Sequence, residues 1–150
     1  MLRMEGILEV KGKVGIGAGS RIDVGKNATL SFIGNVANSA GVTIVCGDRI
    51  TIGNNTVISW DTLIIDTDFH YVMDLETGKT KPMHRPISIG ENTWLCAGSK
   101  ILKGSVLPDG CILSAGSVLN KRFDECNCLL VGNPCDITRR GVTRSDKELN

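Results

Sequence analysis

One histidine and two aspartates stand close together in this chain. The segment from Ile64 to His70 reads Ile-Ile-Asp-Thr-Asp-Phe-His, so Asp66 and Asp68 precede His70 by four and two residues. An imidazole titrates near neutral pH and can take up or release a proton there. The aspartates could orient that imidazole or hold the hydroxyl groups of a ligand. They could equally cap backbone N–H groups in a turn, with the histidine a surface residue beside a loop, and the spacing alone leaves both interpretations open.

A metal centre is not expected. The cysteines occupy positions 46, 96, 111, 126, 128 and 135. Cys126 and Cys128 have one residue between them, whereas the cysteine pairs of structural zinc sites are usually spaced more widely. We interpret most of these thiols as small core residues of a protein from a reducing compartment.

The composition favours β structure. The chain has 150 residues and a mass of 16.1 kDa, the size of one domain. Isoleucine and valine together number 27 and glycine 18, while aromatic residues make up only 4%, which favours strands with many turns over a helical bundle. The net charge of +1 argues against nucleic-acid or membrane-surface binding through bulk charge. No apolar run is long enough for a membrane span, and the first six residues lack the apolar stretch of a secretory signal, so we expect a cytoplasmic protein.

A six-residue repeat organises the second half of the chain. Aliphatic residues recur at every sixth position, and a small residue follows each of the first five after four positions. The aliphatic positions are Ile89, Leu95, Ile101, Leu107, Leu113 and Leu119, and the small ones are Thr93, Ser99, Ser105, Cys111 and Ser117. This period fits neither an amphipathic helix nor a coiled coil. It predicts short strands that stack into a parallel β-solenoid with an inward aliphatic ladder. Upstream, the repeat includes Ile52, Ile58 and Ile64 and is less regular over residues 7–50.

The repeat fails once, over residues 71–86. This stretch is polar, contains two of the four prolines and shows no strand signal. We interpret it as a loop extruded from the solenoid with His70 at its root, and long loops in compact repeats usually carry function. The repeat puts Asp68 at an inward, small-residue position, where an unpartnered carboxylate would be costly. The general rule for parallel crossovers predicts a right-handed coil.

Several segments together resemble the hexapeptide-repeat acyltransferases. Residues 64–70 resemble the Asp-x-Asp-x-His segment of the sugar O-acetyltransferase branch, which is related to galactoside and maltose acetyltransferases. Residues 87–94, Ile-Ser-Ile-Gly-Glu-Asn-Thr-Trp, are similar to the restart of the repeat after the loop, residues 113–118 to a glycine-containing coil, and residues 131–135 to the exit from the repeat. The resemblance covers roughly residues 7–140. It implies a left-handed parallel β-helix of triangular cross-section, which replaces the right-handed default.

This resemblance implies one all-β domain over residues 1–150 with one extruded loop near residues 71–86. For the tail from about residue 137 to 150, a short helix and disorder both stay open.

The resemblance also implies an acetyltransferase with a defined catalytic residue. His70 would be the general base, taking the proton from an acceptor hydroxyl as that hydroxyl attacks the thioester of acetyl-CoA, without an acyl-enzyme intermediate. Asp66, Asp68 and Trp94 would contact the acceptor, a sugar or polysaccharide precursor. A backbone N–H would stabilise the oxyanion. No metal is implied.

The implied site for acetyl-CoA extends over several coils. It comprises small residues for the pantetheine arm and polar residues for the nucleotide end: Ala97, Ala115, Gly116, Asn120, Lys121, Arg139 and Arg140. Cys96, Ser114 and Asp136 depart from the pattern of the family, so the phosphate contacts stay open. The resemblance further implies a homotrimer with active sites between subunits and no nucleic-acid partner.

Other functions are compatible with such a fold. A drug acetyltransferase would use the same histidine, whereas a non-catalytic interaction scaffold would need none of these residues. A γ-type carbonic anhydrase binds its metal through three histidines, two of them from one chain, but here His70 and His84 flank an irregular loop. We interpret His84 as an exposed residue, and Trp60 matches no motif of the family.

Overall fold

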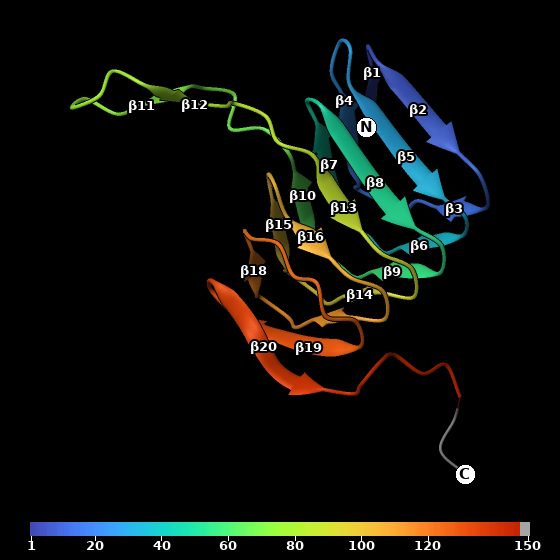
Figure 1. Ribbon diagram of the computed structural model, residues 1–150. Coiled ribbons are helices and arrows are strands. Elements are labelled where there is room, and N and C mark those ends of the chain that lie inside the picture. Colours follow the sequence, from blue (N-terminus) through green and yellow to red (C-terminus); the bar gives the residue numbers. More distant parts are fainter. Residues whose placement is uncertain (148–150) are drawn as a thin grey trace.

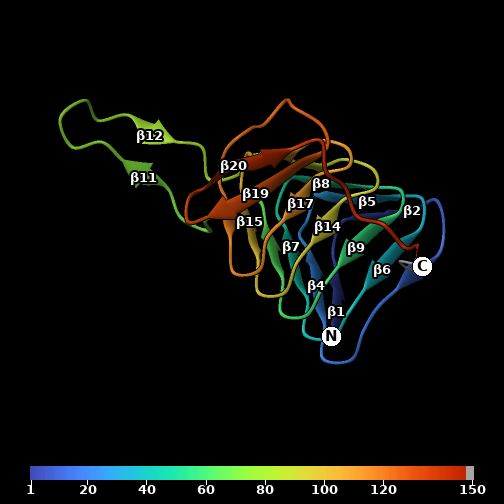
Figure 2. The same ribbon diagram turned by 90° about the horizontal axis from the view of Figure 1, so that it is seen from below.

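The computed structural model describes residues 1–147 and shows a left-handed parallel β-helix of about six coils, as the family resemblance implied. Figure 1 shows the coils stacked along one axis, and Figure 2 shows the roughly triangular outline that their three sheets produce. No helix occurs among the described residues. No helix in that part of the chain is therefore long and apolar enough to cross a membrane.

Each complete coil contributes one strand to each of three sheets, which we call A, B and C in the order in which the chain visits them. Sheet A contains β1 (Leu2–Met4), β4 (Arg21–Val24), β7 (Thr43–Cys46), β10 (Leu63–Ile65), β15 (Lys100–Leu102) and β18 (Val118–Leu119). Sheet B contains β2 (Ile7–Val10), β5 (Thr29–Ile33), β8 (Arg49–Gly53), β13 (Ile87–Ile89) and β16 (Val106–Leu107). Sheet C contains β3 (Val14–Gly15), β6 (Val36–Asn38), β9 (Thr56–Ile58), β14 (Trp94–Leu95), β17 (Ile112–Leu113), β19 (Cys128–Gly132) and β20 (Cys135–Arg140).

The core is the aliphatic ladder that the repeat predicted. On sheet A the register pairs Ile22 with Ile44, Ile44 with Ile64, Ile64 with Ile101, and Ile101 with Leu119. All five side chains are buried. The aliphatic and small residues of the six-residue repeat are buried as well, so that prediction is confirmed. The spacing along the ladder is 22 residues in the first step and 20 in the second, but 18 in the last, because the early coils have longer corners. These longer corners explain why the repeat is irregular over residues 7–50.

Hydroxyl groups at several of the small positions form hydrogen bonds to the turns that join the sheets. Thr56 Oγ1 donates to the Gly53 carbonyl at 2.8 Å, and Ser105 Oγ lies 2.6 Å from the Leu102 carbonyl. A small hydroxyl residue therefore suits the inward corner. It fills little volume, and its hydroxyl bonds a turn carbonyl, which a purely apolar residue cannot do.

The extruded segment leaves the solenoid at the corner between sheets A and B. Figure 1 shows it standing away from the body as a hairpin of β11 (Val72–Met73) and β12 (Thr80–Lys81), which pair antiparallel. No strand was predicted for this segment, but the structure has these two short strands, which pair only with each other rather than with a coil. The coils above and below continue without interruption, since Ile64 on β10 pairs directly with Ile101 on β15.

The chain departs from the coil earlier than the repeat suggested. Asp68 was predicted to face inward, but its side chain is 42% exposed, so that prediction is wrong. The buried aspartate is Asp66, because the path turns outward directly after β10 and the six-residue register ends there.

The C-terminal segment is neither a helix nor disordered where the structure describes it. From Cys135 the chain forms β20, which pairs antiparallel with β19 and closes that end of sheet C. Residues 141–147 then pass back along the corner between sheets B and C, where Val142 N donates to the Asn127 carbonyl at 2.9 Å and Arg144 Nη2 to that of Asn55 at 3.3 Å. The part of the predicted tail over residues 148–150 lies outside the described residues.

The outer surfaces of the three sheets differ in polarity. On sheet C the outward row of paired residues is apolar and consists of Ala37, Val57, Trp94, Ile112 and Leu129. Sheet A has a shorter apolar row, Val45, Ile65 and Leu102. The corresponding row of sheet B is mostly polar: Glu9, Ser31, Thr51, Ser88 and Val106. Two of the three faces are therefore suited to contact with other protein surfaces.

Candidate functional site

Asp66 anchors the corner from which the extruded segment departs. Its Oδ1 accepts a hydrogen bond from Gly47 N at 2.6 Å, and its Oδ2 accepts from Asp48 N at 3.0 Å and Arg49 N at 2.8 Å. Gly47 and Asp48 form the turn between β7 and β8 in the preceding coil, and Arg49 is the first residue of β8. Hydrogen bonds to an ionised acceptor are strong, and the Asp66 side chain is 0% exposed. Asp66 thus has the turn-capping role that the sequence left open, and it offers no exposed surface to an acceptor.

His70 lies two residues beyond Asp68, the last paired residue at the root of the extruded segment. Thr67 forms an isolated antiparallel bridge with His84, and Asp68 N donates to the Met83 carbonyl at 3.0 Å. Phe69 has a left-handed φ of 60°, and its N–H bonds Thr67 Oγ1 at 3.0 Å. This turn directs the next residue away from the solenoid. The His70 side chain is exposed, so it is available to a ligand.

Asp68 faces a cation rather than a cavity. Its carboxylate forms an ion pair with Lys103 of the next coil. Asp68 is not among the residues that line the pocket described next. The structure therefore ties the Asp68 carboxylate to Lys103 and leaves its predicted contact with an acceptor as a prediction.

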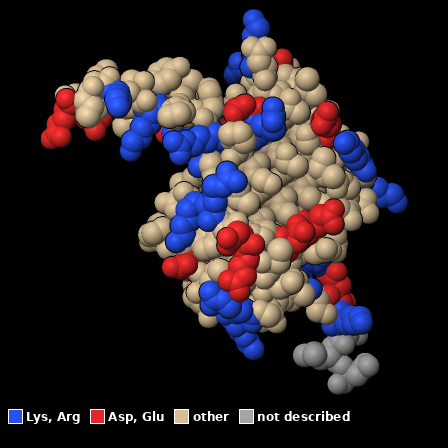
Figure 3. Space-filling model, viewed as in Figure 1, with Lys and Arg blue, Asp and Glu red and all other residues tan. Residues whose placement is uncertain are grey.

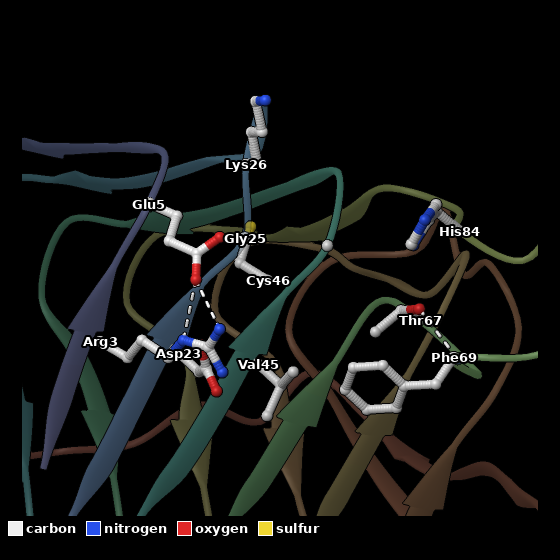
Figure 4. Close-up of a pocket in the computed structure, with 11 residues that line it drawn as sticks. Arg3, Glu5, Asp23, Gly25, Lys26, Val45, Cys46, Thr67, Phe69 and His84 are labelled. Atoms are coloured by element: carbon white, nitrogen blue, oxygen red, sulfur yellow. Dashed lines mark hydrogen bonds and ion pairs between the residues drawn. The ribbon is translucent and has the colours of Figure 1, made fainter.

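A pocket of about 280 Å³ lies beside the root of the segment, across the ends of β1, β4 and β7. Figure 4 shows Arg3, Glu5 and Asp23 on one side and Phe69, Thr67 and His84 on the other, with Val45 and Cys46 between them. The lining is completed by Gly25, Lys26 and Gly47. Apart from the histidine, two acidic and two basic side chains balance each other, and Phe69 adds an aromatic ring. The sequence did not identify this pocket, because its residues come from four coils and share no motif.

His84 is more enclosed than the sequence suggested. It was interpreted as exposed, but it is half-buried, and its Nδ1 is enclosed without a hydrogen-bond partner. A Cβ added at Gly47 would lie 2.7 Å from this Nδ1, so the imidazole packs on the backbone of Gly47. An enclosed N–H without an acceptor is costlier than a bare lone pair, so the tautomer that carries its proton on Nε2 fits this enclosure better. In that tautomer His84 has an N–H donor at Nε2.

The thiol that lines the pocket is not suited to nucleophilic attack. Burial, together with the charge of Asp66, raises the pKa of Cys46 to about 12. The thiolate is the reactive form of cysteine, so Cys46 stays protonated near neutral pH. All six cysteines are free.

The two tryptophans lie on other parts of the coil. Trp94 lies on the outer surface of sheet C, and its Nε1 donates to Ser59 Oγ at 3.0 Å. Trp60 is 60% exposed at the corner between sheets C and A. Sheet C is opposite the corner that carries His70, so one chain does not bring Trp94 and His70 together.

The small residues predicted to line the pantetheine arm do lie together. Ala97, Ala115 and Gly116 stack at the corner between sheets C and A, where Gly116 N donates to the Ala97 carbonyl at 3.0 Å. A Cβ added at Gly116 would meet no atom within 4 Å. This corner is therefore an open column of small residues along which a thin ligand could approach the backbone.

The residues predicted for the nucleotide end are spread over two further parts of the surface. Asn120 and Lys121 follow β18 at the corner between sheets A and B, where Lys121 Nζ lies 3.8 Å from Asp136 Oδ1 and 5.1 Å from the centroid of the Phe123 ring. Arg139 and Arg140 lie on β20, and Arg140 pairs with Glu125 at 2.9 Å. A single chain thus does not gather all seven predicted residues around one ligand.

No cluster of three or more potential metal ligands occurs among residues 1–147. Cys126 is exposed while Cys128 is buried. The two thiols therefore do not present a shared metal-binding surface.

Comparison with known proteins relates both the sequence and the fold to acetyltransferases. No profile of a known protein family matches the chain. Galactoside O-acetyltransferase from Escherichia coli (strain K12) is 30% identical over 122 residues, which are 81% of this chain and 55% of that protein. The crystal structure of the polysialic acid O-acetyltransferase OatWY has a TM-score of 0.75 at 20% identity and covers 99% of this chain and 92% of OatWY. In sequence and in fold the chain is thus similar to hexapeptide-repeat acetyltransferases.

A second similar structure has been solved with acetyl-CoA bound. The hexapeptide-repeat acetyltransferase VCA0836 from Vibrio cholerae O1 biovar eltor, in complex with acetyl-CoA, has a TM-score of 0.71 at 22% identity and covers 87% of this chain and 70% of VCA0836. The chain spans 43–60% of the length of the curated relatives that it matches over most of its own length.

Proposed function

We propose that this protein is an acetyl-CoA-dependent O-acetyltransferase that acetylates a hydroxyl group of a sugar or polysaccharide precursor, with His70 as the general base. The observation that carries the proposal is the position of His70, which is exposed at the root of the only long excursion from the described coils and directly follows Phe69, a residue that lines the pocket. The relatives add support, since they include a galactoside and a polysialic acid O-acetyltransferase. Acetyl-CoA is available inside cells, so the proposal places the reaction in the cytoplasm.

In the proposed reaction the His70 imidazole takes the proton from the acceptor hydroxyl. The oxygen then attacks the acetyl carbonyl, and a backbone N–H stabilises the oxyanion that forms. Collapse of the tetrahedral intermediate breaks the C–S bond, and the imidazolium returns its proton to the departing thiolate of coenzyme A. The protonated state of Cys46, the thiol in the neighbouring pocket, supports direct transfer rather than an acyl-enzyme.

The chemistry of the pocket is compatible with a hydroxyl-rich acceptor. The carboxylates of Glu5 and Asp23 can accept hydrogen bonds from hydroxyl groups, His84 can donate one, and Phe69 offers an aromatic face for the C–H groups of a sugar ring. For acetyl-CoA, the open column at Ala97, Ala115 and Gly116 fits a pantetheine arm. No nucleic acid takes part in this scheme.

The active unit is proposed to be a homotrimer with its sites between subunits. The apolar outward rows on sheets A and C support this, because in a three-fold ring each copy contacts its two neighbours with two different faces. The polar sheet B would then face solvent. A trimer could also bring Trp94 of one copy toward His70 of another, two residues that a single chain keeps on different faces.

Light scattering on the purified protein tests the trimer. We expect a mass of about 48 kDa, three times the 16.1 kDa of the chain. The substitution Ile112→Glu, in the apolar row of sheet C, should shift the mass toward that of the monomer and abolish turnover, because it would place an unpaired carboxylate in the contact. Ser88→Glu on sheet B is the matched control and should leave the mass unchanged. A wild-type protein that is monomeric and fully active would contradict the trimer.

Mass spectrometry tests the proposed activity. The protein is incubated with acetyl-CoA and a panel of mono- and oligosaccharides, and products are detected by a gain of one acetyl group. Direct detection is preferable to a thiol-colour assay because the chain has six cysteines of its own. Acetylated sugar is the expected product. If only drug acceptors in a parallel panel are acetylated, the protein is a drug acetyltransferase, and if acetyl-CoA neither binds nor reacts, it is a scaffold.

A further inference from the structure

Lys103 occupies the coil corner directly next to the point where the hairpin leaves. It follows β15, and the register pairs Leu102 on β15 with Ile65 on β10. Lys103 is therefore the neighbour of Asp66, the last residue before the excursion. On the face seen in Figure 3, Lys and Arg side chains gather on the body below the root of the hairpin.

The Lys103 ammonium group contacts both legs of the excursion. Its Nζ donates to the Pro82 carbonyl at 2.8 Å, on the leg that returns to the coil. It also forms the ion pair with the carboxylate of Asp68, on the leg that leaves the coil. An ammonium group has three donors and can make these contacts together. The Lys103 side chain is only 21% exposed, so one cation from a rigid coil joins the two legs to the body.

The hairpin has few other attachments. At its root, Asp68 N bonds the Met83 carbonyl and Arg85 N bonds the Asp66 carbonyl, each at 3.0 Å. Residues 70–82 are all exposed, and β11 and β12 pair only with each other. A two-stranded hairpin has marginal stability by itself. The direction in which His70 points from the body therefore depends on the root. Gly104 N of the next coil bonds the Arg85 carbonyl at 3.1 Å, and Lys103 is the side chain of that coil that holds the two legs closer to the hairpin.

We propose that Lys103 is a positioning residue for His70: by holding Asp68 and Pro82 to the coil, it fixes the root of the hairpin and thereby the placement of the imidazole. This inference rests on the proposed role of His70 as the base. Lys103 acts through the two legs and does not itself contact the reacting atoms. Misplacing a catalytic group by about an ångström can lower a rate roughly a hundredfold, so a contact of modest strength can have a large kinetic effect.

The test compares Lys103→Met, Lys103→Arg and Asp68→Asn with the wild type. Methionine keeps a long apolar stem without the charge, and because Asp68 is exposed the fold should persist. We expect kcat to fall roughly ten- to a hundredfold in Lys103→Met, while KM for acetyl-CoA changes less than about twofold. Arginine can still pair with Asp68 and should recover most of kcat. The double variant with Asp68→Asn should be no slower than Lys103→Met, since Lys103→Met already removes the ion pair that Asp68→Asn would break.

Hydrogen exchange of the same variants gives a readout that does not depend on turnover. Amides of residues 67–86 should exchange faster in Lys103→Met, while those of β9 and β14 should be unchanged. Unchanged exchange at the root, or unchanged kcat, would overturn the proposal. A raised KM for acetyl-CoA with normal kcat would also overturn it and would make Lys103 a phosphate-binding residue. His70→Ala is measured in parallel, because a fully active His70→Ala variant would refute the proposed function itself whatever the behaviour of Lys103.

Discussion

Replacing His70 by alanine is expected to lower kcat for acetyl transfer roughly a hundred- to ten-thousandfold, the usual contribution of a positioned general base. The KM for acetyl-CoA should change little, because the proposed role of His70 is to take a proton from the acceptor hydroxyl, whereas the binding of acetyl-CoA is assigned to other residues such as Ala97 and Ala115. The fold should be unaffected, since the His70 side chain is exposed beyond the root of the hairpin. Steady-state rates from the mass-spectrometric assay, with the acceptor identified by the panel, provide the measurement.

The second histidine of the chain supplies a matched control. His84→Ala removes the only other imidazole, and because His84 lines the pocket, we expect a raised KM for the acceptor with kcat largely retained. The two substitutions should therefore distinguish loss of the general base, which lowers kcat, from loss of a pocket contact, which raises the KM for the acceptor. If His84→Ala abolished turnover and His70→Ala did not, the assignment of the base would have to be reversed.

Replacing Asp66 by alanine is expected to cause the largest loss of stability of any exchange near the site. It would leave the N–H groups of Gly47, Asp48 and Arg49 without their acceptor, and each unsatisfied buried donor costs about 1–3 kcal/mol. Allowing for water at this partly buried corner, we expect the free energy of unfolding to fall by about 3–5 kcal/mol. For a domain of this size that lowers Tm by roughly 10 °C or more, which a thermal melt followed by circular dichroism would record.

Asp66→Asn and an exposed aspartate make the comparison specific. Asparagine can place its carbonyl where Oδ2 now accepts from Asp48 and Arg49, but its NH₂ group would face the N–H of Gly47, so an intermediate loss is expected. Asp124→Ala removes a carboxylate from an exposed residue and should leave Tm within about a degree. An Asp66→Ala variant with unchanged Tm and a raised KM for the acceptor would contradict the capping role and restore the acceptor-binding role.

The repeat allowed the solenoid to be predicted because each coil uses the same local rule. Leu95, Ile101 and Leu113 are buried since every sixth residue points inward, and this holds wherever successive corners have equal length. The six-residue rule no longer predicts the inward positions where corners are longer, as between Ile22 and Ile44. It also misplaced Asp68, because periodicity alone does not show at which residue the chain leaves the coil. Handedness came from the family resemblance, against the general crossover rule.

The site could be predicted only in part. His70 belongs to a contiguous motif, and the sequence therefore singled it out as the candidate base. The pocket combines Arg3, Glu5 and Asp23 with residues more than forty positions later, and no local pattern connects them. Lys103 escaped notice for the same reason: its partners Asp68 and Pro82 become its neighbours only when two coils stack.

The hairpin is inserted in a way that allows it to be replaced as a unit. Its two legs lie side by side at one corner, and the ladder from Ile64 to Ile101 runs past them without a gap. A longer, shorter or chemically different excursion can therefore replace it without any change in coil register. Over evolution, residues 71–82 could therefore change in length and chemistry while the coils stay constant. For engineering, the same junction is a place where foreign sequence can be grafted with little risk to the solenoid.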